Sequence, residues 1–364
     1  MKQLFVAATR QNDGKTLVSL GLCNAILQRY PDMGYMKPVG QQYQIIDGEK
    51  IDKDASLVYK TYGFSDNLSH MSPVAIPRGF TSDFIAGNRS VDPLLSRIQE
   101  AKTALAKNKR FMLYEGTGHA GVGSMFGLSN ATVAKTLKTP VILVTLGGIG
   151  RTIDEFMLNK ACFDQAGVPV LGVIVNKVLP EKYDEIMPIV KRGFDKLNIP
   201  VFGVMPVESL LSWPSIMALK HDLNAVWLSD SEDGVLNCVE RFIIGDMQPQ
   251  DALHVIRPNS VLIVPGNREG LILAALFDSV FNNDHKNRLS GIIFTNNKAP
   301  EPKVLDLMKR TKIPLLQVAE DAFSVAMRIN KMIFKVYSRE SQKITAAQQL
   351  VAKYIDADRL MNQL

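Results

Sequence analysis

The chain opens with a short apolar segment, a polar loop and the tripeptide Gly14-Lys15-Thr16, and this order constrains its fold more than any other feature. Residues 4–8 are apolar, and residues 16–29 carry apolar side chains at helical spacing. A loop between a strand and a helix directs backbone N–H groups at an anion, and the helix dipole adds positive potential. The sequence therefore predicts a phosphate-binding loop (P-loop) at the first strand-to-helix turn of an α/β domain.

The loop residues suit Mg-ATP. Gly14 lets the backbone approach the phosphates, Lys15 neutralises the β- and γ-phosphates, and the Thr16 hydroxyl binds Mg²⁺. Asn12 stands where a glycine is common, and asparagine tolerates a positive φ. We predict that ATP and Mg²⁺ are the cofactors. The predicted nucleotide contacts from the loop are Asn12, Asp13, Gly14, Lys15, Thr16 and Leu17. The alternative is a helix start with an incidental Gly-Lys-Thr sequence.

The rest of the first half predicts a doubly wound domain with a mostly parallel sheet. Apolar segments without alternation are typical of strands buried on both faces of such a sheet. They lie at residues 35–39, 111–114, 141–145, 170–175 and 201–204. The connections between them are long enough for crossover helices, as at residues 153–166.

The second half predicts a smaller α/β domain. Its expected strands lie at residues 260–264, 291–295 and 315–318, and its expected helices at residues 271–281, 304–310 and 341–360. Two further apolar runs occupy residues 225–228 and 239–244. We place the domains at residues 1–214 and 215–364, because 364 residues exceed one typical core.

Composition excludes several classes of partner. The net charge of +6 comes from scattered basic residues, so nucleic-acid binding is not expected. The sequence contains no stretch of 18 or more uncharged apolar residues, so a membrane-spanning helix is not expected. The first eight residues are too few for a signal peptide, and the three cysteines lack metal-ligand spacing. We therefore expect a cytoplasmic protein.

Charged residues follow several of the predicted strands. In an open α/β sheet, ligands bind outside the carboxyl ends of the strands. Lys15, Lys37, Asp54 and Glu115 are therefore expected in one crevice, with Thr16, Asp54 and Glu115 as metal ligands. Lys37 has the alternative of an ordinary solvated lysine, and Asp54 that of a helix N-cap. Glu115 follows an apolar strand, which is an unusual place for an idle carboxylate.

These motifs together resemble dethiobiotin synthetase and the related cobyrinate-diamide synthases. The resemblance covers about residues 1–210 and rests on Gly14-Lys15-Thr16, Lys37-Pro38-Val39, Asp54-Ala55 and Glu115-Gly116-Thr117-Gly118. It implies that Lys15 binds phosphate, that Asp54 and Glu115 bind Mg²⁺, and that Asn176 contacts adenine. In that family a carboxylate or carbamate attacks the γ-phosphate, which implies catalytic roles for Lys15 and Lys37. Two segments depart from the synthetase pattern, Gly40-Gln41-Gln42-Tyr43 and Arg10-Gln11. These departures argue against the synthesis of dethiobiotin itself.

The second half resembles a DRTGG domain. The resemblance rests on residues 264–269, 293–297 and 351–358, with Asn267 and Asn296-Asn297 replacing the usual aspartate and glycines. Both domains together are similar to the N-terminal region of long bacterial phosphotransacetylases. We predict an ATPase or an ATP-dependent, carboxylate-activating enzyme whose small-molecule substrate is unknown. The alternative is a regulatory nucleotide sensor, and a homo-oligomer is expected.

Overall fold

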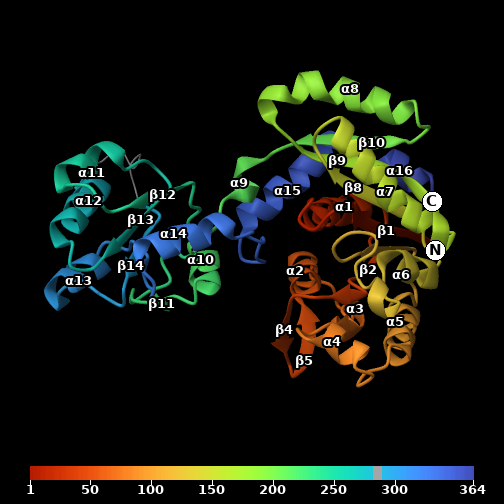
Figure 1. Cartoon of the computed structure of the whole chain (residues 1–364), viewed down its shortest axis with the longest axis horizontal. Coiled ribbons are helices and arrows are strands. Elements are labelled where there is room, and N and C mark those ends of the chain that lie inside the picture. The colour runs from red at the N-terminus through yellow and green to blue at the C-terminus, as the bar shows by residue number, and fades with distance from the viewer. Residues whose placement is uncertain (282–288) are drawn as a thin grey trace. The chain divides into compact units, whose positions relative to one another are not determined.

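The computed structural model describes residues 1–281 and 289–364 and divides into two compact units (Figure 1). The first unit comprises Met1–Glu208 together with Ser341–Leu364, and the second comprises Ser209–Glu340. This division differs from the predicted one, 1–214 and 215–364, chiefly at the C-terminal end. Residues 341–364 pack with the first unit, although the sequence analysis had joined them to the second.

The first unit is built on a parallel six-stranded sheet in the order β10-β9-β8-β1-β7-β2. Its strands are β1 (Lys2–Ala8), β2 (Gly34–Met36), β7 (Phe111–Glu115), β8 (Val141–Leu146), β9 (Val170–Val178) and β10 (Val201–Pro206). Two small sheets pair β3 (Val39–Gly40) with β6 (Val74–Ala75) and β4 (Tyr43–Ile46) with β5 (Glu49–Asp52). The expected strand at residues 35–39 is therefore divided, and Lys37 lies in the break.

Helices join and cover these strands. They are α1 (Lys15–Arg29), α2 (Lys53–Tyr62), α3 (Leu68–Met71), α4 (Phe80–Ile85), α5 (Asp92–Leu105), η1 (Ser124–Phe126), α6 (Asn130–Leu137), α7 (Gly150–Ala166), η2 (Pro180–Lys182), α8 (Tyr183–Asp195), α15 (Ser341–Tyr354) and α16 (Ala357–Asn362). In the sheet order β1 lies between β7 and β8, and the chain crosses over β1 when it passes from β7 to β8. The phosphate loop follows β1 and therefore lies near the middle of the sheet's carboxyl edge.

The expected C-terminal helix at residues 341–360 is two helices, α15 and α16. The break occurs where the Asp356 N–H donates to the carbonyl of Phe202 on β10 at 2.8 Å and Ile355 pairs with Gly203. Helix α15 packs against α1, as the blue and red ribbons of Figure 1 show. A Cβ atom added to Gly21 would lie 2.2 Å from the Cβ of Val351. This close packing explains why the segment belongs to the first unit.

The second unit contains a five-stranded sheet in the order β11-β15-β14-β13-β12, in which only β11 runs antiparallel to its neighbour. Its strands are β11 (Val226–Trp227), β12 (Arg241–Ile244), β13 (Ser260–Pro265), β14 (Gly291–Thr295) and β15 (Leu315–Gln317). Its helices are α9 (Ser209–Ser212), α10 (Ile216–Asp222), α11 (Pro249–Val255), α12 (Glu269–Phe281), α13 (Pro302–Lys309) and α14 (Ala322–Lys331).

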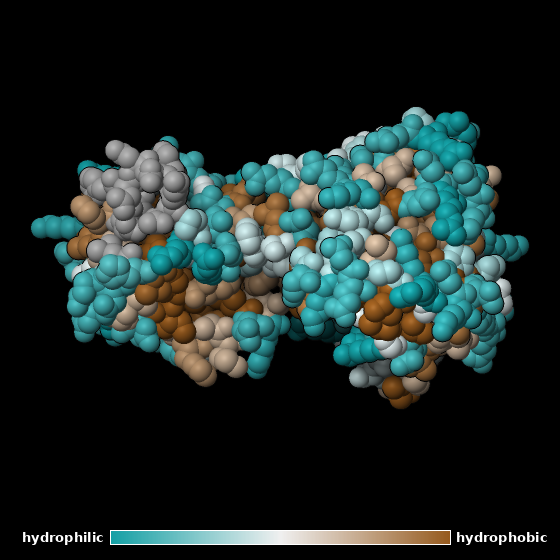
Figure 2. Space-filling view, turned by 90° about the horizontal axis from the view of Figure 1, so that it is seen from above, coloured by the Kyte–Doolittle hydropathy of each residue, from teal (hydrophilic) through white to brown (hydrophobic). Residues whose placement is uncertain are grey.

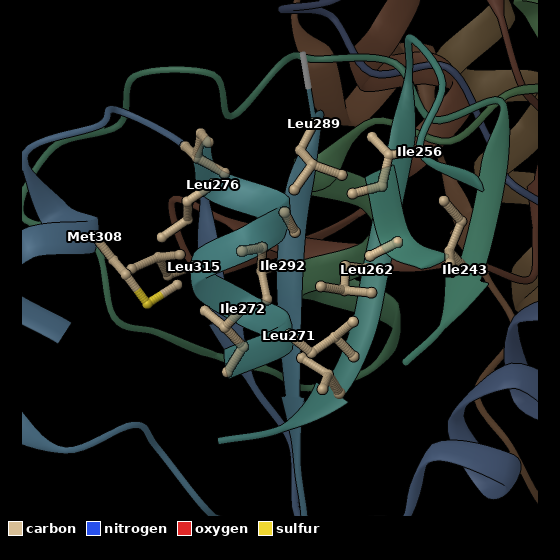
Figure 3. Packing of buried hydrophobic residues seen from close by; sticks show 14 of the residues in the cluster. Ile243, Ile256, Leu262, Leu271, Ile272, Leu276, Leu289, Ile292, Met308 and Leu315 are labelled. Atoms are coloured by element: carbon tan, nitrogen blue, oxygen red, sulfur yellow. The ribbon is translucent and has the colours of Figure 1, made fainter. Parts of the chain in front are cut away.

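The second unit has its own core on both faces of this sheet. On one face, Leu271 and Ile272 of α12 pack over Leu262 and Ile292 of the central strands (Figure 3). On the other face, apolar residues of α10 and α14 pack with Ile263 and Ile293 of the same strands. Burial on both faces is what the continuous apolar strands predicted.

Hydrophilic and hydrophobic residues are interspersed on the face of the molecule shown in Figure 2. Within residues 1–281 and 289–364, no helix has both the length and the apolar character that a membrane crossing requires.

Candidate functional site

The loop between β1 and α1 has the backbone conformation of an anion cradle. Asn12 has a φ of 70° and Gly14 a φ of 103°, and no side chain caps the helix that begins at Lys15. The first N–H groups of any helix lack intrahelical partners, and the helix dipole makes this end positive. A Cβ atom on Gly14 would lie 2.1 Å from the Asn176 amide nitrogen, so the position requires glycine. The loop can therefore present backbone N–H groups to a phosphate.

Asp13 stabilises the loop from inside. Its Oδ2 accepts hydrogen bonds from the Thr9 hydroxyl and from the Arg10 N–H, both at 2.7 Å. The Thr9 hydroxyl also forms a hydrogen bond with the Thr145 hydroxyl on β8 at 3.1 Å. The other oxygen, Oδ1, is buried without a hydrogen-bond partner in the described part of the chain. Burial raises the pKa of this carboxyl group, although the bonds from Thr9 and Arg10 oppose the shift.

Lys15 reaches across the loop. Its ammonium group donates to the carbonyl of Gly118 at 2.8 Å and lies 3.5 Å from the carbonyl of Arg10. Burial, with a smaller contribution from the charge of Lys37, lowers the pKa of Lys15 to about 8. The side chain therefore lies between the phosphate loop and the loop that follows β7.

Lys37 is buried and fully engaged. Its ammonium group donates to Glu115 Oε1 at 2.9 Å, to Asp54 Oδ2 at 3.0 Å and to the carbonyl of Gly116 at 3.0 Å. Only 3% of Lys37 is exposed, so it is not an ordinary solvated lysine. Burial alone would lower the pKa of Lys37, but the carboxylates of Glu115 and Asp54 raise it above its usual value. Lys37 is accordingly a charged ammonium group in the interior.

Asp54 is not the N-cap of α2, because Asp52 has that role. The Asp52 side chain accepts a hydrogen bond from the Asp54 N–H at 2.8 Å. The Asp54 side chain instead forms the ion pair with Lys37. Of the two alternatives that the sequence left open for Asp54, the structure excludes the N-cap.

Glu115 connects the phosphate loop to Lys37. Its Oε1 accepts from the Thr16 hydroxyl at 2.9 Å as well as from Lys37, and its Oε2 accepts from the Tyr35 hydroxyl at 2.9 Å. Tyr35 was missed by the sequence analysis, which treated it as a strand residue. It stands two positions before Lys37, and residues at that spacing share a strand face. Burial and the neighbouring carboxylate raise the pKa of Tyr35, so its hydroxyl is a neutral donor.

The predicted metal ligands, Thr16, Asp54 and Glu115, supply one hydroxyl and two carboxylates around the Lys37 ammonium group. No group of three or more His, Cys, Asp or Glu side chains that could hold a metal occurs among the residues that the structure describes. Two carboxylates and a hydroxyl fit Mg²⁺, which usually takes one or two protein carboxylates together with substrate phosphates and water. The donor set therefore fits a metal ion that arrives with a nucleotide.

Asn130, also missed by the sequence analysis, holds the loop after β7. Its Oδ1 accepts from the Thr117 N–H at 3.0 Å, and its Nδ2 donates to the carbonyls of Thr117 and His119 at 2.8 and 2.7 Å. The exposed His119 accepts a hydrogen bond from the Gly121 N–H at its own Nδ1, as expected of a turn residue. The amide of Asn130 thus fixes the segment that contains Gly118, the partner of Lys15.

Asn176 lies against the phosphate loop from the end of β9. Its Nδ2 donates to the carbonyl of Asp13 at 2.8 Å. The next residue, Lys177, donates from its ammonium group to the carbonyl of Asn12 at 2.8 Å. Lys177 has a φ of 60°, and sequence reasoning gave no signal for it.

A parallel sheet with this loop at the first strand-to-helix turn defines a P-loop nucleotide-binding protein. The chain belongs to the family described as AAA domain, whose model matches residues 2–215, and a DRTGG domain model matches residues 218–332. The similarity to phosphotransacetylase and dethiobiotin synthetase that the motifs predicted is confirmed by the relatives of the chain.

The phosphate acetyltransferase of Synechocystis sp. is 26% identical over 99% of this chain and 51% of its own length. The ATP-dependent dethiobiotin synthetase of Aromatoleum aromaticum is 26% identical over 56% of this chain and 89% of its own. Among solved structures, the MinC:MinD cell division protein complex of Aquifex aeolicus aligns with 58% of this chain and 84% of that chain, at 13% identity and a TM-score of 0.36. The chain spans about half the length of the phosphate acetyltransferases that it matches.

Proposed function

We propose that the first unit binds Mg-ATP in its phosphate loop and transfers the γ-phosphate to a small carboxylate. The observation that carries this proposal is the network at Glu115, whose Oε1 accepts from both Thr16 and Lys37. It joins the loop that would hold the phosphates to a buried ammonium group and a second carboxylate, Asp54. Phosphoryl transfer needs positioning and charge neutralisation, and these groups supply both.

Each residue has a distinct role in this proposal. Lys15 and the N–H groups of Asn12 to Leu17 would bind the phosphates of the nucleotide. Thr16, Asp54 and Glu115 would hold Mg²⁺, which neutralises charge on the transferring phosphate when it is bound. Lys37 would orient the carboxylate acceptor, and to do so its ammonium group must exchange one of its three present acceptors. One relative of the chain is ATP-dependent by name, which supports ATP as the nucleotide.

A second candidate is a regulatory nucleotide sensor with little or no catalysis. The observation that favours it is that three acceptors of the protein itself already engage the ammonium group of Lys37. In addition, nearly the whole chain aligns with about half of each phosphate acetyltransferase, where it would be accessory to another catalytic part. In this case ATP occupancy would change the protein's conformation, and hydrolysis would be slow or absent.

The two candidates differ in turnover. We would measure Mg-ATP binding by calorimetry, and phosphate release with and without a panel of small mono- and dicarboxylates. Lys15→Ala is expected to weaken ATP binding more than about tenfold, because it removes a charge-assisted contact. Lys37→Gln is expected to keep the affinity for ATP within a few-fold of that of the wild type and to reduce turnover by about a hundredfold. Lys60→Ala, an exposed lysine on α2, is the control for loss of a lysine.

The outcomes separate the candidates. Tight Mg-ATP binding with no turnover on any carboxylate would exclude the enzyme and support the sensor. Absence of ATP binding would contradict both. Removal of Lys37 leaves buried carboxylates without their ammonium partner, so the melting temperature of each variant must be recorded. Lys37→Arg retains the charge and tests the geometry if Lys37→Gln does not fold.

We also propose a cytoplasmic location. Cys162 is an exposed free thiol, and Cys23 is a buried one. Free thiols persist in a reducing compartment. Cell fractionation with an antibody against the chain would test this, and recovery in an extracellular fraction would contradict it.

A further inference from the structure

The segment at the end of β9 contacts the phosphate loop at two successive carbonyl groups. Asn176 Nδ2 donates to the carbonyl of Asp13, and the Lys177 ammonium group donates to the carbonyl of Asn12, each at 2.8 Å. The Asn176 Oδ1 also accepts from the N–H of Lys177 at 2.9 Å. The Asn176 amide is therefore fixed against the backbone of Lys177, and both side chains are directed at backbone atoms of the loop.

Fixing these carbonyls also fixes amides. In a planar trans peptide, the carbonyl of one residue and the N–H of the next point in opposite directions. The bonds to the carbonyls of Asn12 and Asp13 therefore turn the N–H groups of Asp13 and Gly14 to the opposite side of the loop. Consecutive N–H groups presented in this way form an anion-binding concavity. The contacts from β9 thus keep the loop in a phosphate-binding conformation before any ligand arrives.

The hydrogen bonds and burial of Asn176 also decide whether its side chain can contact the base of the nucleotide. The family resemblance implied that Asn176 reads adenine, and an asparagine that does so presents its amide oxygen and nitrogen side by side to the base. Here Asn176 is only 1% exposed, its nitrogen and oxygen are bonded to backbone atoms, and its nitrogen lies against Gly14. Its amide nitrogen is bonded to the loop and its amide oxygen to the backbone of β9, and the buried side chain is not accessible to a base.

We propose that Asn176 and Lys177 form a two-point clamp on the phosphate loop, and that this site recognises the triphosphate of a nucleotide with little selectivity for the base. The clamp consists of the contacts to the carbonyls of Asn12 and Asp13 and is independent of base identity. This inference rests on the proposed nucleotide binding. It assigns Asn176 and Lys177 as positioning residues that act through the loop.

The test compares ligands that share a triphosphate and differ in the base. Calorimetric titrations of the full chain would use ATP, GTP, CTP and inorganic triphosphate, each with Mg²⁺. The dissociation constants of the wild type for ATP, GTP and CTP are expected to agree within about threefold. Asn176→Asp removes the amide donor and keeps the side-chain shape, and Lys177→Asn introduces a residue that suits a positive φ. Each variant is expected to weaken the binding of all four ligands by a similar factor, about tenfold.

A conservative variant distinguishes positioning from general destabilisation. Lys177→Arg can still donate to the carbonyl of Asn12 and is expected to retain nearly full affinity, at a melting temperature similar to that of Lys177→Asn. Because Lys177 is exposed, its variants are expected to fold even if Asn176→Asp does not. Selective loss of ATP binding in Asn176→Asp, or a tenfold preference of the wild type for ATP over GTP, would overturn the proposal. Failure of all four ligands to bind the wild type would instead overturn the nucleotide function on which it rests.

Discussion

At the scale of single residues, Lys15 is a buried lysine whose ammonium group has the Gly118 carbonyl as its near partner. Because burial lowers the pKa of Lys15 to about 8, its charge destabilises the folded chain below that pH. Between about pH 8 and the unfolded value of 10.5, the unfolded chain binds more protons than the folded one, so stability rises with pH. We predict that the free energy of unfolding of the wild type rises relative to that of Lys15→Met over this range, by roughly 3 kcal/mol at most.

Urea unfolding of both proteins at several pH values from neutral to about pH 10 would measure this change. The comparison with Lys15→Met cancels groups that titrate in both proteins, and Lys60→Met controls for loss of a surface lysine. A difference between wild type and Lys15→Met that stays constant with pH would contradict the buried, destabilising charge. A lysine kept at a cost to stability is expected where it serves a ligand.

The sequence predicts those residues of the site that are charged and lie near the end of a predicted strand. Lys15, Lys37, Asp54 and Glu115 stand at or soon after the ends of strands, and the structure places them in adjoining hydrogen-bond networks. Tyr35 and Asn130 were missed because their roles depend on which side chain meets them from another element. The contact of Asn176 with a loop carbonyl likewise depends on the packing of β9 against the loop, which no local pattern encodes.

At the scale of elements, the packing of α15 on α1 depends on Gly21. A Cβ atom there would lie 2.2 Å from the Cβ of Val351, which cannot move without shifting α15. We predict that Gly21→Ala destabilises the chain by about 1–3 kcal/mol through overpacking, although alanine favours a helix by up to about 1 kcal/mol. Urea unfolding measures the change. Gly150→Ala is the matched control, because a Cβ atom at Gly150 in α7 meets nothing within 4 Å.

A double-mutant cycle isolates the contact. Val351→Ala removes the methyl groups that Gly21→Ala would meet, so the two changes together should destabilise less than the sum of the single effects. Strict additivity would show that the loss in Gly21→Ala does not come from α15.

The elements themselves were predicted more reliably than their partners. Buried parallel strands are read directly from continuous apolar runs, as at β8 and β13. The apolar spacing of residues 341–360 predicts a helix but not which core it covers. Its assignment to the second domain was therefore made from chain order, whereas the segment packs on α1. The break at Ile355 depends on the pairing with Gly203, another contact remote in sequence.

At the scale of the whole molecule, the chain leaves the first unit at Glu208 and returns to it at Ser341. Each unit has a sheet and a core of its own, so we predict two unfolding transitions in calorimetry. Mg-ATP should raise the midpoint temperature of only one of them, because a ligand stabilises the unit that binds it.

Deletion of residues 341–364 removes α15 and α16. It should lower the midpoint temperature of that same transition, since α1 then loses the helix packed at Gly21. Deletion of residues 357–364 alone is the milder control, because it keeps α15. If Mg-ATP and the longer deletion act on different transitions, the C-terminal helices do not belong to the nucleotide-binding unit in solution.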